Sequence, residues 1–356
     1  MASVAVPATA PTLQLESLSR AALGAQPASW WRSVLGLVTF GPAPAALPVG
    51  DVPVAHVGLP LLGASDVAFE AWRLDAALSS GRLGRLRYRR GASVLFGAIE
   101  VPEVAKADGH GGTAMALRDA TTAAYAEIFT ALCELGCPHP LRIWNYFGAI
   151  TAEDEFGERY RQFNTARRAA FAQAARAVEG DVPAACALGS RAGSPLVIYL
   201  LASTRPPRAV ENPRQLSAYH YPREYGPDSP TFSRAAIAPA ELGAALFISG
   251  TASIVGHRSV HPGDARAQAR ESVRNVLALI DEANRGATAL RYAPADFRYK
   301  AYVREDADLA AIGEELAAGF APVHPPLYLK ADVCRSELLV EIEAVGEPQP
   351  AGPRRA

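Results

Sequence analysis

Two glutamates lie close together near the C-terminus, in the stretch Tyr328–Ala344, YLKADVCRSELLVEIEA. Strand alternation puts Glu341 and Glu343 on one face and Val340 and Ile342 on the other. A carboxyl group in a strand that is otherwise apolar is costly unless it is solvated, paired or used. Burial disfavours the charged form, so such a carboxyl holds a proton and can donate it as a general acid. Glu341 is therefore a candidate acid; the alternative is that both glutamates lie on a solvated sheet face.

Neither cysteine nor histidine spacing predicts a metal site. The sequence has four scattered cysteines, Cys133, Cys137, Cys186 and Cys334. The first two lack the second ligand pair of a zinc site, and His257 and His261 flank a loop without a third ligand at suitable spacing. Glycine-rich phosphate loops are also absent. We expect free thiols, no metal and no cofactor.

The composition indicates a soluble globular protein. Of the 356 residues, 49% are hydrophobic and 20% are charged, which suits one large or two ordinary domains. The net charge of −1 excludes a whole-chain electrostatic attraction to nucleic acid or to an anionic membrane. The N-terminus lacks the charged start and apolar core of a secretory signal, and no apolar run reaches the length of a membrane span. These features predict a cytoplasmic protein.

Apolar periodicity and turn residues predict the same order of elements twice. The first half shows strands within 30–61 and 80–101, a helix over 117–135, a strand over 141–147, a helix over about 154–178 and a strand over 195–203. The second half shows strands over 216–221 and 245–248, a helix over 264–284, a strand over 297–303, a helix over 308–319 and a strand over 338–343. The repeated order predicts an α+β fold made of two sheet-and-helix units, which indicates an internal duplication.

Composition shifts divide the chain into four parts. Residues 1–25 are rich in Ala, Pro and Ser, and we expect them to be poorly ordered. An N-terminal α+β domain then covers 26–208, and a second domain covers 209–346, with the boundary in the proline-rich stretch Pro206–Pro213. Residues 347–356 form a C-terminal tail.

The second unit resembles the RidA/YjgF family. The matching stretches are SPTFSRA from Ser229, LFISGT from Leu246, QARESVRNVLALIDEA from Gln268 and ELLVEIEA from Glu337. The resemblance implies the chorismate-mutase-like topology of that family, and the active-site glutamate of its closing strand falls on Glu341. The carboxylate-binding arginine of the family would fall near Pro326, where PVHPPLYL has no arginine. This departure disfavours a simple imine hydrolase.

The chain as a whole resembles the chorismatases more specifically. The stretches that carry this resemblance are RIWNYF from Arg142, RYRQFNTARRAAF from Arg159, SAYHYPREYG from Ser217, SGTASIVGH from Ser249 and ADVCRSELLVEIE from Ala331. Members of this family cleave chorismate and release pyruvate, with a glutamate as the proton donor. The resemblance therefore implies that chorismate is the substrate, that Glu341 is the acid, and that the reaction belongs to secondary metabolism.

Chorismate carries two carboxylates, and arginine forks and tyrosine hydroxyls are suited to bind them. Tyr160 and Arg167 are seven residues apart in a predicted helix, about two turns, and therefore share one face. Tyr219, Arg223 and Arg234 come from the second unit, so we expect a pocket between the two units. For each arginine the alternative is an ordinary surface charge.

Two small residues are used to distinguish the types of chorismatase. Cys334 and Gly250 resemble the type that forms 3-hydroxybenzoate, whereas the hydrolytic type, which forms a dihydroxycyclohexadiene carboxylate, tends to carry alanine at both positions. The resemblance thus implies Cys334 as a catalytic residue, Gly250 as part of the substrate site, and 3-hydroxybenzoate as the product. The hydrolytic reaction and a non-catalytic, RidA-like metabolite-binding protein are the alternatives. The sequence does not indicate an oligomeric state.

Overall fold

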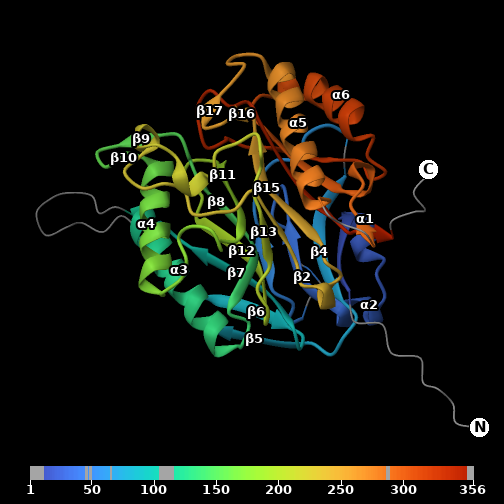
Figure 1. Ribbon diagram of the computed structural model, residues 1–356. Coiled ribbons are helices and arrows are strands. Elements are labelled where there is room, and N and C mark those ends of the chain that lie inside the picture. Colours follow the sequence, from blue (N-terminus) through green and yellow to red (C-terminus); the bar gives the residue numbers. More distant parts are fainter. Residues whose placement is uncertain are drawn as a thin grey trace, which may run out of the picture.

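Three β-sheets make up most of the structure, and helices cover their outer faces (Figure 1). The computed structural model describes residues 12–350 except 45–46, 48–49, 65, 104–115 and 286–288. None of the helices in this part of the chain is both long and apolar enough to cross a membrane.

A four-stranded sheet, which we call the N-terminal sheet, contains the strands expected within 30–61 and precedes the two repeated units. Its order is β1-β4-β2-β3, with β1 Leu13–Ser19, β2 Val34–Thr39, β3 Val54–His56 and β4 Val67–Leu74, and its helices are α1 Arg20–Gly24 and α2 Ala28–Ser33. The prediction that residues 1–25 are poorly ordered is therefore wrong for 12–24, because Leu13 and Leu15 are buried in the core and Ser19 caps α1; residues 1–11 lie outside the described residues. The predicted N-terminal domain of 26–208 contains β2 to β4 of this sheet together with the sheet of the first unit, while β1 lies before it.

The first unit has a six-stranded sheet in the order β5-β6-β7-β12-β8-β11. Its elements are β5 Ser79–Leu83, β6 Leu86–Arg90, β7 Val94–Val101, α3 Ala116–Glu134, β8 His139–Gly148, α4 Arg159–Gln173, β11 Ala184–Ser190 and β12 Leu196–Ser203. A small hairpin, β9 Glu153–Asp154 and β10 Gly157–Glu158, precedes α4. This helix starts later than predicted because the hairpin turns at Gly157, whose φ is +92°.

The second unit has a six-stranded sheet in the order β13-β14-β15-β21-β19-β20. Its elements are β13 Arg208–Val210, β14 Ala235–Ile237, β15 Leu246–Ala252, α5 Ala265–Ala283, β19 Arg298–Val303, α6 Leu309–Phe320, β20 Leu327–Lys330 and β21 Val340–Gly346. Two short pairs, β16 Ile254–Val255 with β17 Arg258–Ser259 and β18 Leu290–Arg291 with β22 Gln349–Pro350, lie beside it.

The two units have the same topology. In each, three consecutive antiparallel strands are followed by a helix, a strand, a second helix and two strands, and the last strand inserts beside the third. The strand after the first helix pairs in parallel with the next strand in both units, β8 with β11 and β19 with β20. The predicted α+β class and internal duplication are confirmed. The boundary at 208/209 falls within β13 and stays a prediction.

The predicted strand over 216–221 is wrong. This segment forms two short 3-10 helices, η1 Ala218–His220 and η2 Arg223–Tyr225. Pro213, Pro222, Pro227 and Pro230 lie in and around it, and proline lacks the N–H that a sheet ladder needs. The segment therefore crosses the surface as a series of turns.

All three sheets bury one face in a common core. The core contains Leu35, Val38 and Trp72 of the N-terminal sheet, Phe96, Trp144 and Tyr199 of the first unit, and Phe247, Tyr302 and Leu329 of the second. The Trp72 ring lies 5.8 Å from that of Trp144 and 5.9 Å from that of Phe247, so one side chain touches both units. The outer faces pack in separate clusters against α1 and α2, α3 and α4, and α5 and α6.

Candidate active site

The two units meet along a seam where β11 lies against β14 and β15. The backbone N–H of Ala185 donates to Ser249 Oγ at 3.0 Å, and that hydroxyl donates to the Ser233 carbonyl at 2.7 Å. Further along, Gly189 and Asp332 exchange two backbone hydrogen bonds. These bonds are buried, and they fix the register of one unit against the other.

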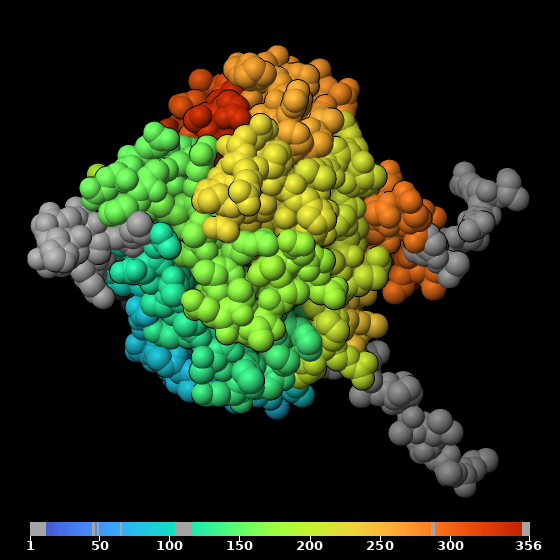
Figure 2. Space-filling model, turned by 60° about the vertical axis from the view of Figure 1, so that its left-hand side comes forward, coloured from blue at the N-terminus to red at the C-terminus, as the bar shows by residue number. Residues whose placement is uncertain are grey.

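A cavity of about 550 Å³ opens at this seam. Its lining comes from β8, α4 and β11 of the first unit and from η2, β15, β21 and the loop before β21 of the second. Figure 2 shows the three outer segments, around residues 155, 222 and 335, side by side on one face. The lining residues used below are Asn145, Tyr160, Arg161, Arg167, Cys186, Tyr221, Tyr225, Arg234, Gly250, Cys334, Arg335 and Glu341.

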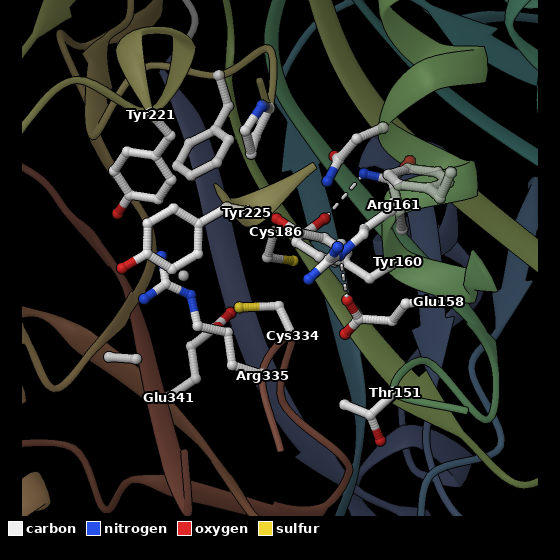
Figure 3. A pocket seen from close by; sticks show the side chains of 18 of the residues that line it. Thr151, Glu158, Tyr160, Arg161, Cys186, Tyr221, Tyr225, Cys334, Arg335 and Glu341 are labelled. Carbon is white, nitrogen blue, oxygen red and sulfur yellow. Dashed lines mark hydrogen bonds and ion pairs between the residues drawn. The ribbon is translucent and has the colours of Figure 1, made fainter. Parts of the chain in front are cut away.

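Glu341 projects into this cavity from β21 and is only 4% exposed (Figure 3). No described residue forms a hydrogen bond or ion pair with its carboxyl group. Burial and the neighbouring Glu343 carboxylate together raise the pKa of Glu341 to about 8, although Arg142 and Arg234 oppose them. The side chain therefore carries a proton at neutral pH, and the alternative of a solvated sheet face is excluded.

Gly250 makes room for this carboxyl group. The pairing of β15 with β21 shifts register between Ile248 and Thr251, so Gly250 lies at an irregularity beside Glu341. A Cβ added at Gly250 would lie 1.9 Å from Glu341 Oε1, well inside van der Waals contact. The carboxyl group thus rests against the backbone of residue 250, which a larger side chain does not permit.

Glu343, on the same face of β21, has a different environment. Its carboxylate accepts from Arg142 Nη2 at 2.6 Å and from Trp144 Nε1 at 2.9 Å, and Lys300 Nζ lies at 3.0 Å. The two cations hold the pKa of Glu343 below its usual value despite burial. The solvated sheet face considered for both glutamates is therefore excluded for Glu343 as well, since its carboxylate is buried and hydrogen-bonded.

Arg167 reaches the cavity from α4. Its Nε donates to Tyr125 Oη at 2.6 Å, and Nη1 donates to the carbonyl of Thr231, while Nη2 has no partner among the described residues. Tyr125 Oη in turn donates to Asn145 Oδ1 at 2.7 Å. The guanidinium is 2% exposed, which excludes the surface-charge alternative and leaves one buried donor free.

Arg234 enters from the second unit. Its Nη2 donates to the Leu216 carbonyl and to Tyr221 Oη, each at 2.7 Å, while Nε has no partner among the described residues. The guanidinium also lies over the rings of Tyr221 and Phe232. The two units therefore each contribute one buried arginine with an unused donor.

Two further arginines lie at the rim of the cavity (Figure 3). The Arg335 guanidinium stacks 3.9 Å above the Tyr225 ring, and its Nη1 donates to the His257 carbonyl and to Ser259 Oγ, each at 3.0 Å. On the opposite side Arg161 Nε donates to Glu158 Oε2 at 2.8 Å. These contacts hold η2 and the N-terminal end of α4 at the mouth of the site.

Two thiols line the cavity beside Glu341. Burial, together with the Glu341 charge, raises the pKa of Cys334 to about 12, and burial raises that of Cys186 well above its usual value. Both are therefore neutral S–H groups at physiological pH and not nucleophilic thiolates. Within the described chain, no three His, Cys, Asp or Glu side chains form a group that could hold a metal ion.

The structure brings six of the eight predicted site residues to one cavity, namely Tyr160, Arg167, Arg234, Gly250, Cys334 and Glu341. Tyr219 and Arg223 are not part of the lining, and Arg223 is exposed. Because the segment forms 3-10 turns instead of a strand, it presents Tyr221 and Tyr225 to the cavity in their place. The lining also contains Asn145, Cys186 and Arg335, which the sequence did not single out, although Asn145 lies within the stretch RIWNYF.

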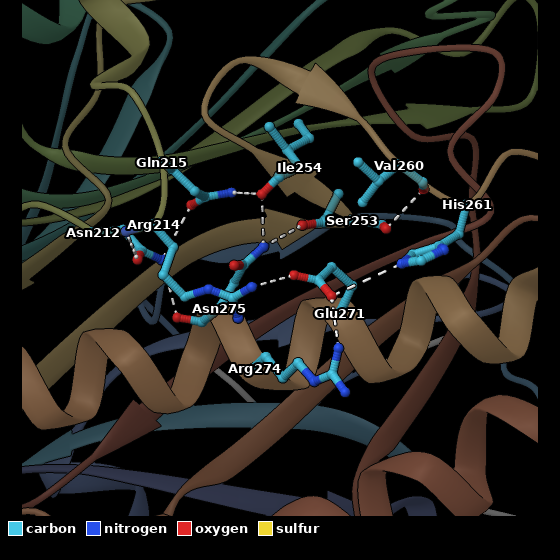
Figure 4. A network of polar contacts seen from close by, with 11 residues as sticks. Asn212, Arg214, Gln215, Ser253, Ile254, Val260, His261, Glu271, Arg274 and Asn275 are labelled. Carbon is cyan, nitrogen blue, oxygen red and sulfur yellow. Dashed lines mark hydrogen bonds and ion pairs between the residues drawn. The ribbon is translucent and has the colours of Figure 1, made fainter.

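A buried polar network on α5 supports one wall of the cavity (Figure 4). Asn275 is fully buried, and its Nδ2 donates to the carbonyls of Ala252 at 3.1 Å and Ile254 at 2.9 Å. Gln215 Nε2 donates to the same Ile254 carbonyl at 3.0 Å. Ala252 pairs directly with Glu341 across the strands, so Asn275 holds the backbone opposite the candidate acid.

Comparisons with known proteins agree with this geometry. The family model described as "Chorismatase FkbO/Hyg5-like, N-terminal" matches residues 70–202. A 3-hydroxybenzoate synthase of Streptomyces hygroscopicus is 36% identical over 88% of this chain and 92% of its own. A chorismatase of Streptomyces rapamycinicus is 37% identical over 78% of this chain and 81% of its own. A crystal structure of a chorismatase covers 96% of this chain and 100% of its own, with 31% identity and a TM-score of 0.80.

A duplicated α+β fold with a buried acid in the seam between its units is the class of protein that the structure defines. The chain belongs to the chorismatase family, because it matches 92% and 81% of the length of two relatives that are 36% and 37% identical to it.

The raised pKa of Glu341 predicts a specific pH dependence of stability. Between about pH 4.5 and pH 8 the carboxyl is protonated in the folded protein and ionised in the unfolded chain. The free energy of unfolding therefore falls by up to about 1.4 kcal/mol for each pH unit across this range, compared with that of a Glu341→Gln variant, which cannot ionise. We expect the stability of the variant relative to the wild type to increase as pH rises. Urea unfolding at several pH values measures this difference. Parallel stability curves would show that Glu341 titrates normally.

Proposed function

We propose that this protein cleaves chorismate into 3-hydroxybenzoate and pyruvate, with Glu341 as the general acid. The observation that carries the proposal is a buried, protonated carboxyl group without a partner, in a cavity that is also lined by two arginines with a free donor each. The membership of the chain in the chorismatase family supports chorismate as the substrate.

Cleavage of an enol ether starts with a proton on its methylene carbon, which produces an oxocarbenium-like cation. Glu341 is suited to this step, since it holds its proton at neutral pH and faces the cavity. After transfer, the Glu341 carboxylate stabilises the cation that it has created. A carboxyl group that an arginine already paired would be ionised and unable to donate.

The two carboxylates of the substrate are assigned to Arg167 and Arg234. The free Nη2 of Arg167 and the free Nε of Arg234 are buried donors, and a buried donor without a partner is costly until a ligand satisfies it. Because the two arginines come from different units, a dianion would bridge the seam. Tyr160, which lines the same cavity, is the third proposed contact.

The product depends on what attacks the cation. Chorismate contains the same atoms as 3-hydroxybenzoate plus pyruvate, so the proposed reaction consumes no water, whereas formation of the diol consumes one. In the proposed route the neighbouring ring hydroxyl adds to the cation in place of water and gives its proton back to the Glu341 carboxylate. The bond between this oxygen and the ring then breaks, and the ring carbon that carries the ether oxygen loses its proton, which makes the ring aromatic. The ketal carbon leaves as pyruvate with the former hydroxyl oxygen, while the ether oxygen stays on the ring and takes up a proton as the phenol. Gly250 supports this route by letting the acid lie against the backbone, and Cys334 supplies a neutral S–H for proton transfer.

The hydrolytic, diol-forming reaction is the second candidate, because two curated relatives carry only the name chorismatase. A non-catalytic metabolite-binding protein is disfavoured by the unpaired Glu341, since a purely binding site has no use for a buried acid that costs stability.

Replacement of the proposed acid is the primary test. Glu341→Gln keeps the shape of the side chain but removes its proton, so turnover should fall by at least roughly 100-fold. In the wild type, kcat/KM should be constant at lower pH and decline as pH rises through about 8, where Glu341 ionises. Pyruvate release, followed with a coupled dehydrogenase, measures both. Glu337→Gln, an exposed lining residue, is the control; more than a tenth of wild-type rate in Glu341→Gln removes the acid assignment.

Arg167→Ala should weaken chorismate binding by about 2–5 kcal/mol, since a buried substrate carboxylate would lose its charged partner. Tyr125→Phe is the matched control: it removes the acceptor of Arg167 Nε but leaves Nη2 available. Steady-state KM and direct binding to Glu341→Gln protein provide the measurement. If Arg167→Ala and Tyr125→Phe weaken binding equally, the arginine is structural.

The product assignment predicts that neither product takes up solvent oxygen. In ¹⁸O-labelled water, 3-hydroxybenzoate should be unlabelled, and pyruvate trapped at once as lactate should be unlabelled as well. Cys334→Ala should shift the outcome towards the diol or suppress aromatisation, while Cys133→Ala, at an exposed site, should not. Mass spectrometry identifies the products. A wild-type diol, or a Cys334→Ala variant with unchanged product and rate, contradicts the assignment.

A further inference from the structure

Four charged side chains form one buried cluster behind Glu341. Lys300 Nζ lies 2.7 Å from Glu70 Oε2 and 3.0 Å from Glu343 Oε1, and Arg142 Nη2 lies 2.6 Å from Glu343 Oε2. All four side chains are less than 10% exposed. We call this set the charge cluster. Its two carboxylates and two cations give the cluster no net charge. Glu343 is its member nearest to Glu341 in the chain, two residues along the same strand face.

The cluster draws on all three sheets. Glu70 comes from β4 of the N-terminal sheet, Arg142 from β8 of the first unit, and Lys300 and Glu343 from β19 and β21 of the second. Glu70 is the one member that belongs to neither duplicated unit. Without it the remaining three side chains would carry a net positive charge directly behind the acid.

We propose that Glu70 is a positioning residue for the chemistry of Glu341: by neutralising Lys300 it leaves the acid beside a cluster with no net charge, so that no surplus cation favours the carboxylate form. The inference rests on the proposed function, in which Glu341 must hold a proton. It assigns a catalytic purpose to the N-terminal sheet, which contributes no residue to the cavity lining.

Other groups that face Glu341 do not replace this role. They are Arg142 on β8, Arg234 ahead of β14, Cys186 on β11, Cys334 ahead of β21, Tyr160 on α4 and Tyr302 opposite it on β19. Arg142 is bound to Glu343, and Arg234 is bound to Tyr221 and a carbonyl. The two thiols and two tyrosines are neutral at physiological pH, since burial raises the pKa of each. The charge of Glu343 is already offset by Arg142, so the charge of Lys300 is offset by Glu70.

Burial also raises the pKa of Glu70, while the Lys300 ammonium opposes that effect. Burial lowers the pKa of Lys300, but the two carboxylates outweigh it and hold the pKa well above its usual value. When Glu70 is replaced, the ammonium keeps Glu343 Oε1 as a charged partner at 3.0 Å. The Glu70→Gln substitution therefore changes the cluster from neutral to positive. Glutamine keeps an oxygen that accepts from Lys300 Nζ, and the fold does not lose the contact.

The test compares Glu70→Gln with the double variant Glu70→Gln/Lys300→Gln. One surplus positive charge roughly 10 Å away lowers a carboxyl pKa by about one unit at an effective dielectric constant of about 20. In Glu70→Gln the high-pH decline of kcat/KM should accordingly move down by about one pH unit. The double variant restores neutrality, so its decline should return towards the wild-type position. Glu16→Gln, which breaks an ion pair with Arg73 elsewhere on the N-terminal sheet, is the matched control and should not move it.

Direct titration of Glu341 separates this inference from the proposed function. Carbon-13 NMR of glutamate-labelled, substrate-free protein, assigned with Glu341→Gln, reports its protonation without turnover. A shift of this titration in Glu70→Gln that the double variant reverses supports the inference, even if the kinetic profile does not follow and the acid assignment fails. No shift in Glu70→Gln, or a double variant that moves further in the same direction, overturns the inference, because a merely structural role predicts cumulative damage and no rescue.

Discussion

The carboxylate of Glu343 is the charge around which the three sheets assemble. It accepts from Arg142 and Trp144 of the first unit and pairs with Lys300, which in turn binds Glu70 of the N-terminal sheet. A buried carboxylate is stable only when fixed donors replace its hydration, so these partners must lie where they do. Loss of one partner would leave an uncompensated charge in the core, and the relative placement of the sheets is therefore tightly constrained.

The pairing of Glu343 with these cations also determines the properties of the neighbouring Glu341. Glu343 takes the available cations, and Glu341, on the same strand face, is left without one. Two carboxylates with nearly identical sequence surroundings thus acquire opposite properties, one ionised and one protonated, because their neighbours differ. This is the general way in which a protein obtains an acid at neutral pH. The stability lost by burying Glu341 is offset by the core that the sheets share.

Internal duplication explains why the site is asymmetric. In each unit the last strand of the chain order inserts beside the third, giving β12 in the first and β21 in the second. Only β21 carries the paired glutamates, while β12 has no charged residue and is buried along its whole length. The first unit supplies the guanidinium of Arg167 and the helix that forms one wall, and the second supplies the protonated carboxyl group of Glu341. Neither unit alone encloses the cavity, which agrees with the tendency of binding sites to lie between domains.

Local sequence pattern predicts the features that depend on neighbouring residues. Period-two alternation placed Glu341 and Glu343 on one face, and repeated periodicity revealed the two units, because neighbours along a chain set side-chain direction. It failed where prolines replaced a strand by turns, so that Tyr221 and Tyr225 face the cavity and Tyr219 and Arg223 do not. Which of the two glutamates stays protonated depends on contacts between distant parts of the chain. Arg142 lies 201 residues from Glu343 and Glu70 lies 230 from Lys300, and no local pattern reports contacts at such separations. The ionisation of a buried group depends on the charges packed against it, and these come from distant parts of the chain.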